Sequence, residues 1–143
     1  MDTATLKVTG INHVVLHVAD VERSARFYEE VLGFEGRFAG GGPGGKMRFL
    51  RCGLQGLDLF EVAPGDVHGG QEMNHMALNV ANDNLDEIVA ELAKVGVKTS
   101  DRTPRNTVFM SDPDGHRIEI LPSGRAQAPA GETRSAVSTE GVS

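Results

Sequence analysis

An eight-residue pattern, Asn-His-x-x-Leu-x-Val-Ala, occurs twice in this chain of 143 residues. With one flanking residue on either side the copies occupy residues 11–20 and 73–82, and five of these ten positions are identical. A repeat in so short a chain indicates two related structural modules, each of which presents one histidine at the same place. The two histidines are His13 and His75. Two imidazoles brought together by such a duplication are a natural beginning for a metal site.

Composition limits the class of protein. The length fits one domain with a sizeable core. The net charge is −6 with both signs interspersed, which argues against a nucleic acid or an anionic membrane as partner. The sequence contains neither a run of eighteen apolar residues nor a signal-peptide pattern, so we expect no membrane span and no secretion. Cys52 is the single cysteine, which excludes an internal disulfide and fits a cytoplasmic protein.

Within residues 9–63 the sequence predicts the element order βαβββ. Residues 11–18 alternate in the manner of a half-buried strand, and Asp20 stands at the expected N-cap of a helix that ends at Gly33. Further strands are predicted near residues 34–38, 47–52 and 57–62. The glycine-rich loop 40–45 is flexible enough to act as a lid over a site.

Residues 73–122 repeat this order after a linker at 64–72. The prediction is a strand at 74–80 that carries His75, a helix that ends at Gly96, and strands at 97–99, 107–110 and 117–121. The fold class is therefore α+β, with two βαβββ modules that form a curved mixed sheet around a metal-binding cleft, in a single domain over 9–122. Residues 123–143 have few large apolar side chains, so we expect a flexible tail.

Alternation along the strands selects candidate ligands, because side chains of one parity share one face of a sheet. His13 and His17 share a face, and His75 takes the same parity in the second module. On the last strand the isoleucines on either side of Glu119 are expected beneath the helices, which turns Glu119 toward the histidines. His13, His75 and Glu119 then form a set of two imidazoles and one carboxylate with open positions, suited to a divalent metal.

The first module has its own counterpart of Glu119. Alignment of residues 57–60 with 118–121 selects Asp58, whereas Glu61 has the wrong parity. Asp58 is either a fourth ligand or an acid that faces the substrate or supports a ligand. His17 is either a general acid or base near neutral pH or a polar residue at a strand end.

Two other histidines have no predicted role. His68 falls in the linker and His116 follows the predicted turn at residues 112–115. Both are expected to be solvated.

The two modules, the strand histidines and the segment Asp-Pro-Asp-Gly-His-Arg-Ile-Glu at 112–119 resemble the vicinal oxygen chelate superfamily. That group includes glyoxalase I, extradiol dioxygenases, fosfomycin-modifying thiol transferases and bleomycin-binding resistance proteins. The resemblance spans residues 9–122 and implies that His13, His75 and Glu119 are metal ligands. It places Asp58 where glyoxalase I and the epimerases have a fourth ligand, normally Glu or Gln. Val15 lies where the fosfomycin enzymes have a catalytic threonine.

The resemblance also implies a homodimer, often with a site shared between modules of two chains, and a small substrate whose adjacent oxygens chelate the metal. A non-haem Fe(II) dioxygenase-type reaction is the first expectation, because three ligands leave room for substrate and dioxygen. The alternative is a glyoxalase I-like lyase or epimerase that uses Ni, Zn, Co or Mn with Asp58 as fourth ligand. The second alternative is a metal-free antibiotic-binding resistance protein. The intact ligand set and an aromatic content of 5% argue against it, because few aromatic rings are available to stack on a planar drug.

Overall fold

The computed structural model describes residues 11–41, 46–69, 71 and 73–124. Among them the chain forms two compact units. One contains the residues up to Met76 together with Ser111–Ile118, and the other contains Ala77–Met110 and the residues from Glu119 onward. The predicted lid falls largely on residues 42–45 and the predicted tail on 125–143, which lie outside the described residues. In the described ranges no helix is both long and apolar enough to cross a membrane.

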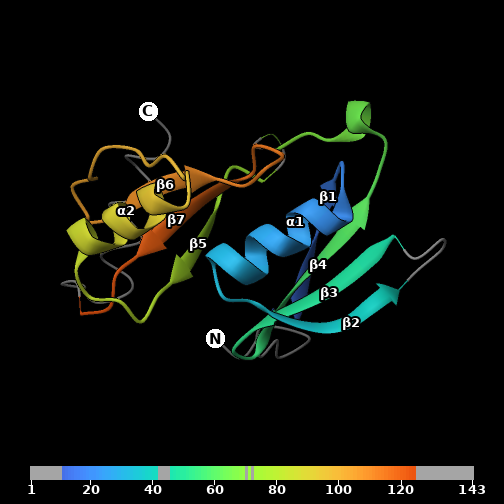
Figure 1. Ribbon diagram of the computed structural model, residues 1–143, viewed down its shortest axis with the longest axis horizontal. Helices are drawn as coiled ribbons and strands as arrows, with labels where there is room; N and C mark the ends of the chain where they lie inside the picture. The colour runs from blue at the N-terminus through green and yellow to red at the C-terminus, as the bar shows by residue number, and fades with distance from the viewer. Residues whose placement is uncertain (1–10, 42–45, 70, 72, 125–143) are drawn as a thin grey trace, which may run out of the picture. The chain divides into compact units, whose positions relative to one another are not determined.

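The first unit is built on a four-stranded sheet with the order β1-β4-β3-β2. Its strands are β1 (His13–Val18), β2 (Glu35–Gly41), β3 (Met47–Cys52) and β4 (Gln55–Glu61). β1 runs parallel to β4, and the other pairs are antiparallel. Helix α1 (Val21–Arg26) lies across one face of this sheet (Figure 1). The βαβββ order predicted for the first module is therefore confirmed. The core that joins helix and sheet consists of buried aliphatic residues, namely Leu16, Val18, Val21, Ala25, Leu50, Leu57 and Leu59.

The start and the end of the first helical segment follow the sequence prediction. The Asp20 side chain accepts a hydrogen bond from the Arg23 backbone amide at 3.0 Å, as an N-cap residue does. After α1 the backbone continues as a π-helix, η1 (Phe27–Val31), and Gly33 follows in the left-handed region with φ of 75°.

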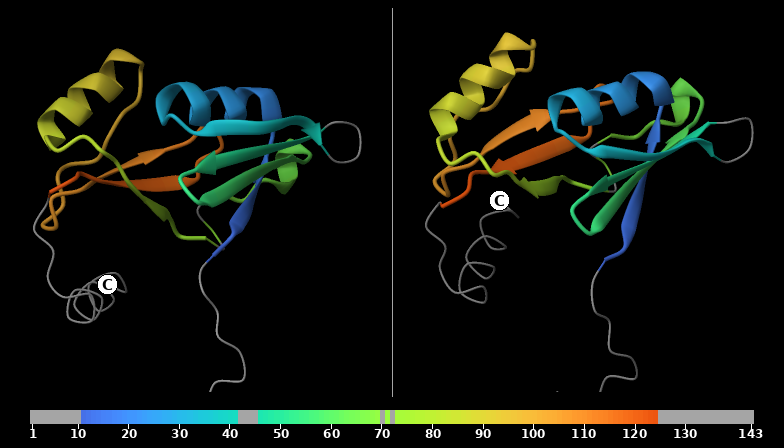
Figure 2. Two further views of the ribbon diagram at one scale, coloured as in Figure 1. Left: turned by 90° about the horizontal axis from the view of Figure 1, so that it is seen from below. Right: turned by 60° about the horizontal axis from the view of Figure 1, so that its bottom comes forward.

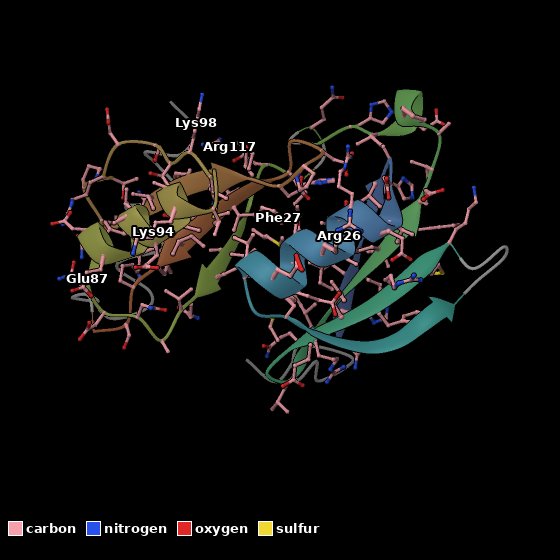
Figure 3. The ribbon with its side chains drawn as sticks, viewed as in Figure 1. Arg26, Phe27, Glu87, Lys94, Lys98 and Arg117 are labelled. Atoms are coloured by element: carbon pink, nitrogen blue, oxygen red, sulfur yellow. The ribbon has the colours of Figure 1, made fainter. Side chains whose placement is uncertain are left out.

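The other sheet has the order β5-β7-β6, with strands β5 (Met76–Asn79), β6 (Val108–Ser111) and β7 (Arg117–Leu121). Helix α2 (Leu85–Lys94) covers one face of it (Figure 2). Asn84 caps α2 by accepting a hydrogen bond from the Glu87 amide at 3.1 Å. The helix buries Leu85, Ile88 and Leu92 and exposes charged residues such as Glu87 and Lys94 (Figure 3).

The second module departs from the prediction in two places. No strand forms at 97–99, so that prediction is wrong. The adjoining Ser100 amide donates a hydrogen bond to the Phe109 carbonyl at 2.9 Å, as in a strand pair. The Phe109 amide, however, donates to the Ser100 hydroxyl instead of to a backbone carbonyl. A side chain thus takes the place of a backbone ladder partner, and no regular strand forms. His75 also lies just before β5 rather than within it. The α+β class holds, and the second sheet has three strands among the described residues.

The turn before β7 belongs to the first unit and is fixed to α1 and η1 by two aspartates. Asp112 is buried, and one of its carboxylate oxygens accepts hydrogen bonds from the Tyr28 hydroxyl at 2.7 Å and from His116 Nδ1 at 2.8 Å. Asp114 accepts a hydrogen bond from the Ser24 hydroxyl at 3.1 Å. Residues more than 80 positions apart in the sequence are thereby joined inside one unit.

His116 is therefore not solvated, and the sequence expectation for it is wrong. The residue is 6% exposed, and both its ring Nδ1 and its backbone amide bind Asp112. The hydrogen bond with the carboxylate raises the pKa of His116 above its usual range, although burial opposes this shift. Burial also disfavours the charged form of Asp112, but the hydrogen bonds from His116 and Tyr28 outweigh it and leave the pKa of Asp112 lowered.

These shifts predict how stability depends on pH. Because the pKa of His116 is raised in the folded protein, the folded protein holds a proton that the unfolded chain loses above about pH 6.5. The contribution of His116 to the free energy of unfolding is therefore complete below that pH and is lost as the pH rises through the folded pKa. The slope is at most about 1.4 kcal/mol per pH unit. Urea unfolding at a series of pH values from 6 to 9 checks it. The His116→Gln variant should lack this part of the slope, and equal slopes in the two proteins would contradict the assignment.

Candidate functional site

His13 and Asp58 lie side by side on neighbouring parallel strands. The register of β1 and β4 pairs Val15 with Asp58, and His13 Nε2 lies 3.7 Å from Asp58 Oδ2. The Asp58 side chain is 13% exposed and that of His13 is 48% exposed, so the pair is open to solvent on the histidine side. The parity argument for Asp58 is confirmed in its geometry, and the role of either side chain as a ligand stays a prediction.

Because Gly56 has no side chain, β4 can approach β1 closely at His13. Gly56 is the register partner of His13, and its amide donates to the Asn12 carbonyl at 2.8 Å. A Cβ atom at position 56 would lie 2.8 Å from His13 Cβ and 3.3 Å from the Asn12 carbonyl oxygen. The first contact is too short and the second is tight, so any larger residue forces a shift of β1, which carries His13, or of β4.

Each repeated histidine is oriented by the asparagine before it. Asn12 Oδ1 lies 2.8 Å from His13 Nδ1, and Asn74 Oδ1 lies 2.8 Å from His75 Nδ1. An amide oxygen only accepts, so Nδ1 is the donor in both contacts, and in the neutral form of each ring the lone pair is on Nε2. A metal-binding histidine is commonly held by a hydrogen bond to its other nitrogen in this way. The donor chemistry of both residues therefore fits a divalent metal.

Glu119 belongs to the second unit, where it is 7% exposed. Its Oε2 accepts a hydrogen bond from the Thr107 hydroxyl at 2.6 Å, and Arg105 Nη2 lies 3.4 Å away. Neither Thr107 nor Arg105 was predicted from the sequence. The one available signal is position, because Thr107 immediately precedes β6, a neighbour of β7 in the sheet.

The structure brings together only part of the predicted constellation. Across the residues that it describes, no three His, Cys, Asp or Glu side chains lie close enough to hold a metal ion. His13 is paired with Asp58, while the set of His13, His75 and Glu119 stays a prediction.

His17 and Glu61 lie near the end of the paired strands β1 and β4 and differ in what they contact. His17 is exposed, and its ring meets that of Phe60 edge-on with centroids 6.0 Å apart. Glu61 instead accepts a hydrogen bond from the Val21 amide at 3.0 Å, which lowers the pKa of its carboxyl. Glu61 thus binds the backbone at the start of α1, and it does not join Asp58 beside His13, in agreement with its parity. The role of His17 as acid or base stays a prediction.

Residues 10–120 match the model of the Glyoxalase/Bleomycin resistance protein/Dioxygenase superfamily, and the chain belongs to this family. The predicted resemblance is confirmed, as is the assignment to an enzyme superfamily without a fixed reaction.

Individual relatives are more distant. The chain is 25% identical to Metallothiol transferase FosB of Lysinibacillus sphaericus, over 80% of this chain and 83% of that protein. It is 27% identical to a probable chloroplastic lactoylglutathione lyase of Arabidopsis thaliana, over 82% of this chain and 37% of that protein. Among solved structures, the fosfomycin resistance protein FosX of Mesorhizobium loti superposes with a TM-score of 0.69 at 18% identity, over 89% of this chain and 98% of that one. This last likeness concerns the fold alone.

The contact between Gly56 and His13 predicts the effect of one methyl group. Gly56→Ala should lower the free energy of unfolding by about 1–3 kcal/mol, the usual range for overpacking, and should shift the imidazole NMR signals of His13. Gly65→Ala is the matched control, because a Cβ at Gly65 meets nothing within 4 Å. Unchanged His13 signals in Gly56→Ala would show that the strand yields elsewhere and that the contact does not position His13.

Proposed function

We propose that this chain is a divalent metal-dependent enzyme acting on a small substrate with two adjacent oxygen atoms. His13, His75 and Glu119 supply the ligands, from one chain or from two chains of a homodimer. The observation that carries the proposal is the pair of oriented histidines, each with Nδ1 held by the asparagine that precedes it, an arrangement common among metal-binding histidines.

Asp58 decides which reaction we favour. Its carboxylate lies 3.7 Å from His13 Nε2, on the side from which His13 would meet a metal. A carboxylate there supports a four-ligand site, the arrangement expected of a glyoxalase I-like lyase or epimerase with Ni, Zn, Co or Mn. The relatives reported above are named as a thiol transferase and a lyase, which supports an oxygen-independent reaction. We therefore place this reaction ahead of the Fe(II) dioxygenase-type reaction that the sequence favoured.

A bound divalent cation would polarise two adjacent substrate oxygens and stabilise the negative charge that develops on them. The chain's own task is to move a proton. Asp58 and His17 are the candidates, because both are accessible groups that lie on the His13 side of the β1-β4 pair. Val15 is 45% exposed between the two histidines of β1 and offers no hydroxyl group. That side chain disfavours a thiol transfer that needs a threonine at this position.

Metal titration of the chelator-treated protein tests the ligands. Asn12→Ala frees His13 Nδ1 and should weaken binding of Zn²⁺ or Ni²⁺ about 10–100-fold. His13→Ala should weaken it at least as much. Asn82→Ala, at an exposed asparagine of the second repeat, is the control and should leave affinity unchanged. A His13→Ala variant with full affinity would refute the ligand assignment. A wild-type protein that bound no divalent metal would instead support the metal-free antibiotic-binding alternative.

Dioxygen dependence tests the reaction. The protein loaded with Ni²⁺, Zn²⁺ or Fe²⁺ is assayed under nitrogen and under air, with the adduct of methylglyoxal and glutathione as probe for isomerisation and catechol as probe for oxygen uptake. Turnover under nitrogen with nickel or zinc is expected, and it should fall in Asp58→Asn while metal is still bound. Turnover only with iron and dioxygen would replace the proposal by the dioxygenase-type reaction.

A further inference from the structure

A cavity of about 310 Å³ opens in the first unit beside β1. Three of the chain's five histidines line it, although the site proposed above involves only one of them. The residues that matter for its chemistry are Val15, His17, Asp66, His68, Met73 and His116. Three imidazoles around one small cavity concentrate hydrogen-bonding groups where a merely structural gap would be apolar.

His116 is the fixed member of this group. Asp112 accepts hydrogen bonds from both the ring Nδ1 and the backbone amide of His116, and the buried Tyr28 hydroxyl holds the same carboxylate. Because Nδ1 is engaged, Nε2 is the ring nitrogen that remains for a ligand in the cavity. The bond with Asp112 also raises the pKa of His116, which favours the form in which Nε2 carries a proton and donates.

The connection between β4 and β5 is packed closely against the turn that carries His116. A Cβ atom at Gly69 would lie 2.5 Å from the Asp114 carbonyl oxygen and 3.0 Å from the His116 amide nitrogen. Only glycine permits this approach without a backbone shift. The connection that brings Asp66 and His68 to the cavity is thus seated directly on the turn, and this contact holds the segments of His68 and His116 together.

We propose that this cavity binds the oxyanion of a small molecule, a carboxylate or a phosphate, with His116 as its fixed donor. His17 and His68 supply further N–H donors, and the apolar side chains of Val15 and Met73 contact the ligand's carbon atoms. At about 30 Å³ per water-sized group, the volume admits roughly ten non-hydrogen atoms. Asp66, an exposed residue, repels the anion and limits its affinity.

The position of the cavity connects it to the candidate metal centre. Val15 is two residues from His13 on β1, about 7 Å along a strand. An acid anchored in the cavity would reach His13 with its other end. This second step, in which the anion is part of the substrate, rests on the proposed function, whereas binding of an anion in the cavity does not.

The experiment uses the full-length protein freed of metal with a chelator, titrated with acetate and, separately, with inorganic phosphate. Imidazole NMR signals of His17, His68 and His116 should shift saturably, while those of His13 and His75 stay in place. Equal shifts at all five histidines, or shifts that never saturate, would overturn the proposal. Saturation with phosphate alone or with acetate alone would support it and identify the oxyanion.

Two variants with opposite expected effects on anion affinity test the proposal further. His68→Gln should weaken anion binding about 10-fold or more, as expected for loss of a hydrogen bond to a charged group. Asp66→Asn should tighten it several-fold, and Asp83→Asn, at an exposed aspartate of the second unit, should leave it unchanged. Weaker binding in Asp66→Asn would overturn the proposal. His116→Gln should abolish binding, and the exposed His68 keeps the test valid if that variant fails to fold.

The same variants separate this proposal from the proposed function. His68→Gln and Asp66→Asn should bind Zn²⁺ or Ni²⁺ as the wild-type protein does. Anion binding without metal binding would support the proposed anion site in the cavity and contradict the proposed metal-dependent enzyme. Metal binding without saturable anion shifts would do the reverse.

Discussion

The buried carboxylate of Asp112 is the interaction on which the first unit depends. It takes hydrogen bonds from a tyrosine 84 residues earlier and from a histidine four residues later. A carboxylate without these donors would be costly to bury, whereas with them it ties the turn before β7 to the helical segment over the first sheet. The first unit is thereby closed by residues from the second half of the sequence.

The two copies of the repeat agree most closely at the candidate metal-binding histidines. Both copies keep not only a histidine but the asparagine that holds its Nδ1, at the same distance of 2.8 Å. The copies diverge in the carboxylates. Asp58 approaches His13 and is partly exposed, whereas Glu119 is buried and engaged by Thr107. The unequal environments of the two acids suit unequal roles, and for this reason the proposed reaction gives Asp58 a part in proton movement.

Strand parity and capping chemistry could be predicted because they depend on neighbours in the sequence. Asp20 caps its helix as predicted, and Asp58 reaches the His13 side while Glu61 does not. The errors arise where a distant partner decides the outcome. A histidine after a tight turn reads as solvated, and only the folded chain shows that Asp112 and Tyr28 enclose His116. The cavity is also invisible in the sequence, since its walls come from a strand, a connection and a turn.

The contact at Gly56 constrains this position whatever side chain residue 13 carries. A Cβ at position 56 would meet His13 Cβ, which every residue except glycine has, and the Asn12 carbonyl oxygen, which belongs to the backbone. In the second module the alignment that pairs Asp58 with Glu119 sets Arg117, not a glycine, opposite the repeated histidine. There the histidine lies off the end of its strand rather than within it. The two halves of the duplication have therefore become unequal in how much substitution each tolerates, and the first half is the more constrained.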